Sequence, residues 1–200
     1  MKTITLTHRN PTIGVRSHRL PLLADSIFGM LIFVATELMF FTALISAFVI
    51  IKASIGAWAP PVGVRLPVVA TALNTLLLLL SGVFLHQSGR WFAIEGHTRR
   101  VRTLLGGAAF LGECFVLIQG YEWLRLIAYG MTMTSGMFGA CFFLLIGTHG
   151  LHAAVATLAM IYLLLRLTRH ELRLDHLHAM QVFWYFVVGV WPVLYGLVYF

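Results

Sequence analysis

Charged residues are scarce in this chain. Asp, Glu, Lys and Arg make up 10% of its 200 residues, whereas 60% are hydrophobic. Soluble proteins carry roughly a quarter charged residues, so this shortage excludes a water-soluble domain and indicates an integral membrane protein. The net charge of +7 does not indicate a nucleic-acid partner, because the basic residues stand in short gaps between apolar runs, where orientation signals lie.

Cysteine is scarce as well, with only Cys114 and Cys141 in the chain. Neither belongs to a CxxC pair or a Cys–His cluster, so no thiol redox function is indicated. The chain also lacks repeats, low-complexity tracts and Gly-rich phosphate loops. Because its loops are short, we expect a water-soluble substrate to bind only inside the bundle or on another subunit.

Long apolar runs are what the chain has in abundance. Five of them approach or exceed the roughly 20 residues that a helix needs to cross a bilayer. They lie at about 24–51, 66–86, 102–127, 135–166 and 178–200. This pattern predicts an all-α fold, an integral membrane bundle of five transmembrane helices. We expect a basic cytosolic tail, 1–23, one transmembrane domain, 24–200, and no C-terminal domain.

Basic residues are distributed unevenly among the segments that flank the five predicted helices. Eleven of the 14 Lys and Arg residues lie in the tail, in the loop between the second and third helices, or in the loop between the fourth and fifth. The other three are Lys52, Arg65 and Arg125. Cytoplasmic segments are enriched in Lys and Arg, so the bias predicts the N-terminus inside and the C-terminus outside. The tail has no cleavage site after a short apolar core, so we expect a cytosolic tail rather than a cleavable signal peptide.

Ionisable side chains inside a membrane are functional candidates, because they are expensive to place in hydrocarbon. The apolar runs contain Glu37, Glu113, His149 and His152, with Asn74 as a neutral companion. Counting about 1.5 Å per helical residue places Glu37, Glu113 and His149 at similar depth. Glu37 and His149 could form a proton relay or a ligand-binding pair. We favour a buried hydrogen bond that joins the first and fourth helices.

His149 and His152 are three residues apart and project from the same side of their helix. A metal site needs further ligands at the same depth, and none is evident. Bis-histidine heme ligation needs a facing histidine, and His86 lies at the end of its run. We therefore predict no metal site, no heme and no catalytic residue in this chain.

Small residues recur four apart on the third and fourth helices, a pattern that lets membrane helices approach closely. The positions expected to serve helix packing are Gly112, Gly136, Gly139, Gly147 and Gly150. Gly147 and Gly150 flank His149, so we expect a neighbouring helix close to its imidazole.

Near the end of the third run, Glu122 and Arg125 are spaced like an ordinary surface pair. The aromatic residues around them favour an anchoring rim over a substrate site.

Several segments together resemble a known family. They are, in order, ATELMFFTALISAF, LNTLLLLLSG, QGYEW, FFLLIGTHGLH and FWYFVVGVWPVLY. Over about 30–195 the chain is similar to subunit III of heme-copper terminal oxidases, especially the five-helix form of bacterial quinol oxidases and some bacterial cytochrome c oxidases. The resemblance maps family residues onto Glu37, Asn74, Glu122, His149 and His152.

The resemblance implies a non-catalytic subunit of a complex that reduces oxygen to water and translocates protons. Heme and copper would lie in partner subunits. The chain would pack directly on subunit I, with subunit II and a small subunit IV as further candidate partners. It would bind phospholipid, support proton uptake and stability, and reside in the bacterial inner membrane.

One departure concerns the last helix. Family members often have a histidine and an aspartate there, whereas this chain reads WYFVV at 184–188, so we expect the helix to lack its usual hydrogen-bonding groups. This difference leaves open a subunit-III-like protein associated with nitric oxide reductases. Two further alternatives are a diheme cytochrome and a small proton channel or transporter that uses Glu37, Glu113 and His149. The absence of an inverted repeat disfavours the transporter.

Overall fold

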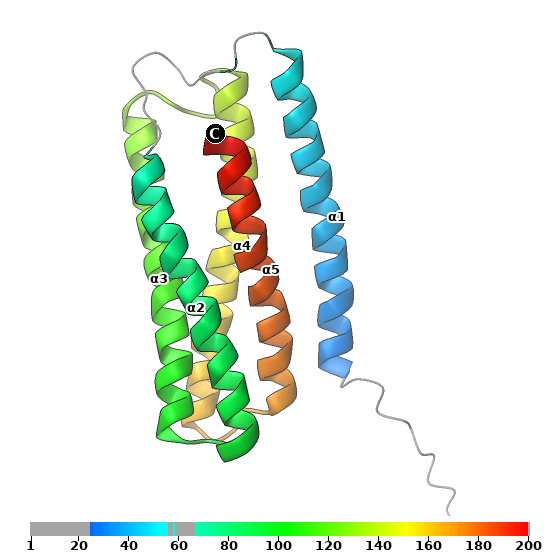
Figure 1. The fold of residues 1–200 in the computed structure, drawn as a ribbon, viewed down its shortest axis with the longest axis vertical. Coiled ribbons are helices and arrows are strands. Elements are labelled where there is room, and N and C mark those ends of the chain that lie inside the picture. The colour runs from blue at the N-terminus through cyan, green and yellow to red at the C-terminus, as the bar shows by residue number, and fades with distance from the viewer. Residues whose placement is uncertain (1–24, 56–57, 59–66, 200) are drawn as a thin grey trace, which may run out of the picture.

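The structure is a computed structural model that describes residues 25–55, 58 and 67–199. All regular elements in these ranges are helices: α1 (Asp25–Ser54), α2 (Val68–Glu95), α3 (Arg99–Ala128), α4 (Met137–Thr168) and α5 (Leu174–Tyr199) (Figure 1). Each is long and apolar enough to cross a membrane, which confirms the predicted five-helix membrane bundle. The predicted tail, 1–23, lies outside the described residues.

The predicted end of the second helix, at residue 86, is wrong, because α2 continues to Glu95. Polar residues interrupt the apolar run after His86, but a buried face continues through Ser88, Gly89 and Phe92. This three- and four-residue spacing keeps one side of the helix against the bundle. His86 therefore lies inside α2 rather than at its end, and α2 and α3 are joined by a very short turn.

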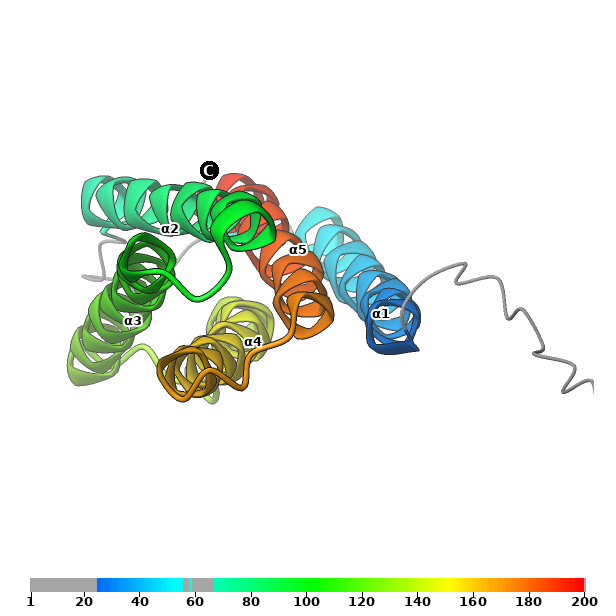
Figure 2. The same cartoon turned by 90° about the horizontal axis from the view of Figure 1, so that it is seen from below.

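Four of the helices surround a common core, and the fifth lies outside them. Figure 2 shows α2, α3, α4 and α5 in a ring, with α1 beside α5. α1 packs mainly against α5, touches α4 less and does not contact α3. Large apolar side chains of α1, including Phe28, Met39 and Ile50, are exposed. α1 therefore presents much of its apolar surface to its surroundings.

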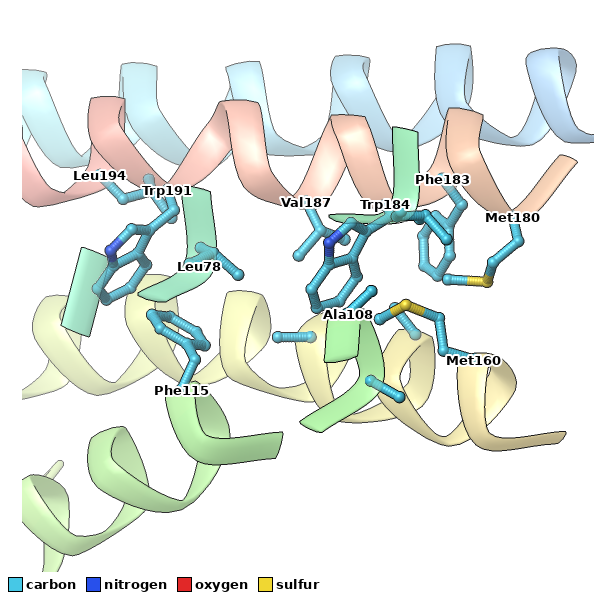
Figure 3. Packing of buried hydrophobic residues seen from close by; sticks show 14 of the residues in the cluster. Leu78, Ala108, Phe115, Met160, Met180, Phe183, Trp184, Val187, Trp191 and Leu194 are labelled. Atoms are coloured by element: carbon cyan, nitrogen blue, oxygen red, sulfur yellow. The ribbon is translucent and has the colours of Figure 1, made fainter. Parts of the chain in front are cut away.

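The core of the ring is built around two tryptophans of α5. Trp184 and Trp191 are fully buried among residues such as Leu78, Phe115 and Met160 from the other three helices (Figure 3). Phe115 and Trp191 pack edge to face, with ring centroids 5.1 Å apart. These aromatic side chains hold the four helices around one centre.

Hydrogen bonds join α2 to α5 along much of their length. Trp184 Nε1 donates to Ser81 Oγ at 3.0 Å, and Trp191 Nε1 donates to Thr75 Oγ1 at 2.8 Å. Further bonds connect Gln181 Nε2 to Leu85 O, Tyr195 OH to Val68 O, and Tyr185 OH to His86 Nδ1. Indole, amide and phenol groups therefore supply the hydrogen bonds of α5, although the family's histidine and aspartate are absent at 184–188.

The five glycines expected at helix contacts have different surroundings. A Cβ added at Gly112 would lie 3.0 Å from the Trp184 ring, and one at Gly150 would lie 2.6 Å from the Trp123 ring. The added atom at Gly139 would meet Thr132 O in the preceding turn. At Gly136 and Gly147 a Cβ would meet nothing within 4 Å, so no described part of this chain packs closely there and their packing role stays a prediction. Gly136 instead has a φ of +134°, a conformation that L side chains rarely adopt.

The two ends of the bundle differ in charge. Arg99 and Arg166 lie at the end where α2 meets α3 and α4 meets α5, whereas Lys52 and Arg125 lie at the other. Lys52 Nζ donates to the carbonyl of Leu197 at 3.2 Å, so a cation meets the C-terminal end of α5. This contact also joins the peripheral α1 to α5, one of the four helices that surround the core.

Candidate functional site

A polar contact links α1 to α4 within the membrane-spanning part of the bundle. His152 Nε2 lies 2.9 Å from Glu37 Oε2, and His152 Nδ1 lies 2.8 Å from the carbonyl oxygen of Thr148. A carbonyl oxygen only accepts hydrogen bonds, so Nδ1 carries a proton. The Nε2–Oε2 contact then holds one more proton, borne either by the carboxyl group or by the imidazolium. Glu37 and His152 therefore form a neutral pair that shares one exchangeable proton.

This pair lies at the edge of the bundle rather than in its core. The side chains of His152 and Glu37 are 16% and 18% exposed. The Phe41 ring packs edge to face against the His152 ring, with centroids 5.3 Å apart. The pair is thus partly open at the surface of the bundle and packed against an aromatic ring on another side.

The prediction that His149 pairs with Glu37 is wrong. His149 is 1% exposed and stacks on the Trp191 ring, with centroids 5.0 Å apart and planes inclined by 27°. Its Nε2 has no hydrogen-bond partner among the described residues. At 3.6 residues per turn, two side chains three positions apart point about 60° apart. That angle directs His152 toward α1 and leaves His149 against α5.

Glu113 does not join Glu37 or His149. It is half-buried on α3 and forms no hydrogen bond or ion pair with any residue that the structure describes. Because α1 and α3 do not touch, no direct relay connects Glu37 with Glu113. Glu37, Glu113 and His149 thus form no continuous chain of ionisable groups within the described residues, and the channel alternative depended on such a chain.

Asn74 and Glu122 each occupy a buried position. Asn74 Nδ2 donates to the carbonyl oxygen of Phe115 at 3.1 Å, which joins α2 to α3. Glu122 is 8% exposed and lies 3.4 Å from the guanidinium of Arg125. Its interpretation as half of an ordinary surface pair is therefore wrong, because only the arginine side of the pair is exposed.

Candidate metal ligands do not gather anywhere in the described ranges. No three His, Cys, Asp or Glu side chains there lie close enough to hold a metal ion. His86, the histidine considered for heme, contacts Tyr185 instead. The absence of heme and metal from the chain in its complex stays a prediction.

A groove lies at the basic end of the bundle between α1, α4 and α5. It has a volume of about 330 Å³, and apolar residues such as Met30, Leu163 and Met180 line most of it. Arg166 and His176 also line it. No sequence pattern marks this site, because the groove forms only where three helices meet.

The chain is similar to known proteins over nearly all of its length. The family model described as cytochrome c oxidase subunit III matches residues 13–200. The probable cytochrome c oxidase subunit 3 of Mycobacterium leprae is 33% identical over 176 residues, which cover 86% of each chain. Cytochrome c oxidase subunit 3 of Synechocystis is 30% identical over 176 residues, or 86% of this chain and 74% of the relative. That of Loxodonta africana is 30% identical over 197 residues, or 92% and 73%.

Proposed function

Because the chain belongs to the cytochrome c oxidase subunit III family, we propose that it is the non-catalytic subunit III of a respiratory heme-copper oxidase. Family membership makes it a multi-pass membrane subunit that works in a complex with the other oxidase subunits. The proposed complex reduces oxygen to water and translocates protons, with heme and copper in its partner subunits. The observation that carries this proposal is a family match that spans all five helices.

We propose that the chain packs directly on subunit I, with subunit II and a small subunit IV nearby. Its proposed location is the bacterial inner membrane, with the N-terminus inside. The exposed apolar surface of α1 supports contact with another membrane subunit, because its own bundle covers so little of that helix. The bundle end that carries Arg99 and Arg166 supports this orientation, because ends rich in Lys and Arg usually face the cytoplasm.

Affinity purification of the tagged chain from its native membrane tests this assignment. We expect a heme-copper catalytic subunit to co-purify in constant ratio, and the preparation to consume oxygen. A chain that purifies stably alone and conducts protons in liposomes would contradict the proposal and favour a channel. A preparation that reduces nitric oxide but not oxygen would favour the nitric oxide reductase branch.

The groove between α1, α4 and α5 supports the proposed binding of phospholipid. Its apolar lining suits an acyl chain, and Arg166 and His176 supply polar groups for a headgroup phosphate. Arg166 Nε also lies 3.7 Å from Glu171 Oε2, but a guanidinium has five N–H donors and can bind both groups. A phospholipid would thus lie along α1 and steady its attachment to the ring.

Replacement of Arg166 by glutamine should lower the amount of phospholipid that co-purifies with the complex. Glutamine keeps a polar side chain but loses the charge, so we expect severalfold less tightly bound anionic lipid, measured by mass spectrometry of the purified complex. Arg169→Gln is the matched control, because Arg169 carries the same charge at the same end of α4 but does not line the groove. Equal lipid content in both variants would argue against this site.

The Glu37–His152 pair supports the proposed role in proton uptake. Its shared proton and partial exposure suit a group that exchanges protons with its surroundings. The pair also fastens α1 to α4, so one contact would serve both stability and proton transfer.

A further inference from the structure

A second cavity lies between α3 and α4, apart from the groove and from the Glu37–His152 pair. Its volume is about 310 Å³, and Trp191 of α5 forms part of its wall. Gly120, Gly147 and Ala154 leave room for it, because none has a long side chain. The lining includes Leu151, whose side chain is exposed, so the cavity reaches the outer surface of the bundle.

Three polar atoms of residues that line this cavity have no hydrogen-bond partner among the described residues. They are His149 Nε2, Gln119 Oε1 and Trp123 Nε1. His149 and Gln119 are 1% and 3% exposed, so solvent around the bundle does not supply the missing bonds. A buried polar group without a partner is destabilising, and three around one cavity indicate a missing ligand.

Neighbouring contacts hold two of these groups in place. His149 stacks on Trp191, and Gln119 Nε2 donates to Tyr199 OH at 3.4 Å. The amide contact leaves Gln119 Oε1 as an acceptor, whereas Trp123 Nε1 can only donate and His149 Nε2 can do either. The unpaired atoms of the lining residues therefore include both a donor and an acceptor.

These groups select the chemistry of the ligand. An acyl chain would leave all three atoms unpaired. An anionic headgroup would find no Lys or Arg among the lining residues. A hydroxyl group donates and accepts at once, and Phe115, Trp123 and Trp191 offer faces for a ring. The volume is at the lower end of the range for small-molecule sites.

We propose that the α3–α4 cavity binds a membrane-soluble molecule whose ring carries a hydroxyl group. The hydroxyl donates to Gln119 Oε1 and accepts from Trp123 Nε1 or His149 Nε2. Either a phenolic ring, such as that of a quinol, or an alicyclic alcohol has this chemistry. The site does not depend on the proposed subunit function, since it is formed entirely by this chain.

Photolabelling of the purified complex tests this site. The probes are an alkylphenol with a diazirine in its chain, the methyl ether of that phenol, and an alkylcyclohexanol with the same diazirine. We expect the phenol, the cyclohexanol or both to label peptides covering 115–123 and 147–154. The ether cannot donate a hydrogen bond, so we expect it to label these peptides about threefold to tenfold less than the hydroxyl probes do. This factor corresponds to the free energy of one hydrogen bond. The stronger of the two hydroxyl probes identifies the ring type.

Two variants sharpen the test. Gly147→Leu should reduce labelling about tenfold, because its side chain occupies cavity space where an added Cβ meets no neighbour. Gln119→Leu should reduce hydroxyl-probe labelling to the level of the ether. Gly29→Leu, on the exposed side of α1, is the control.

Equal labelling by the phenol, the cyclohexanol and the ether in the unmodified complex would overturn the proposal. So would the absence of labelled peptides in both regions, or a high-resolution density map in which water alone fills the cavity. These outcomes are read on the unmodified protein, so a variant that fails to fold does not obscure them.

Discussion

Replacement of Trp184 by alanine is expected to destabilise the bundle by about 3–5 kcal/mol, the usual cost of removing a buried aromatic side chain. Trp184 is fully buried and donates to Ser81 Oγ. Its indole also extends across the core from α5 to α3, where it packs beside Gly112. Alanine would leave a cavity in the core between α5 and α3 and a serine hydroxyl without its donor. Thermal release of the chain from the purified complex measures the loss.

Two controls separate packing from hydrogen bonding at this position. Trp184→Phe keeps an aromatic ring but removes the donor, so a smaller loss is expected, including about 1 kcal/mol for the bond. Phe110→Ala removes an aromatic side chain that is 68% exposed on α3, and its effect should stay within about 0.5 kcal/mol. If Trp184→Ala and Phe110→Ala lowered stability by similar amounts, the α5 tryptophan would not be holding the four core helices together.

Replacement of His152 by leucine is expected to weaken the α1–α4 contact by about 1–2 kcal/mol, as measured for polar contacts between model membrane helices. It would leave the Glu37 carboxyl group without its partner. α1 would then depend more heavily on α5 and on the Lys52 contact with Leu197. Thermal release of the chain from the complex would occur at lower temperature.

Glu37→Gln separates the structural role of the pair from its proton. His152 Nδ1 donates to Thr148 O, so a neutral ring presents Nε2 as an acceptor for the glutamine N–H. We expect near-normal stability in this variant and slower proton uptake during turnover, followed with a pH-sensitive dye. A Glu37→Leu/His152→Leu double variant should regain stability relative to His152→Leu, because no polar group is left alone. Glutamine as disruptive as the single leucine would count against a shared proton.

The number and approximate position of the helices could be predicted from the sequence. Each span needs about 20 apolar residues in succession, and that is a local property that five separate runs satisfy. The end of α2 could not be read in the same way. Beyond His86 the helix remains buried on one face only, and an amphipathic continuation does not appear in a count of apolar residues.

The residues of the candidate site could be identified, but their partners could not. Glu37, His149 and His152 were recognisable because ionisable groups are rare in a membrane. Estimated depth then favoured His149 over His152 as the partner of Glu37, and the structure reverses that choice. Depth alone does not say which way a side chain points around its helix. The unpaired Gln119 and Trp123 were not identified at all, because an unpaired atom is recognised only from its neighbours.

The sequence by itself determined the membrane class, the five spans, the uneven placement of basic residues and the family motifs, because each depends on composition or short-range order. The tertiary structure decided which helices touch: α1 lies against α5, and α5 donors meet α2 acceptors. It also decided that Gly147 borders a cavity while Gly112 faces a tryptophan. These outcomes depend on the rotation of each helix about its axis, which is set by the packing of all five together.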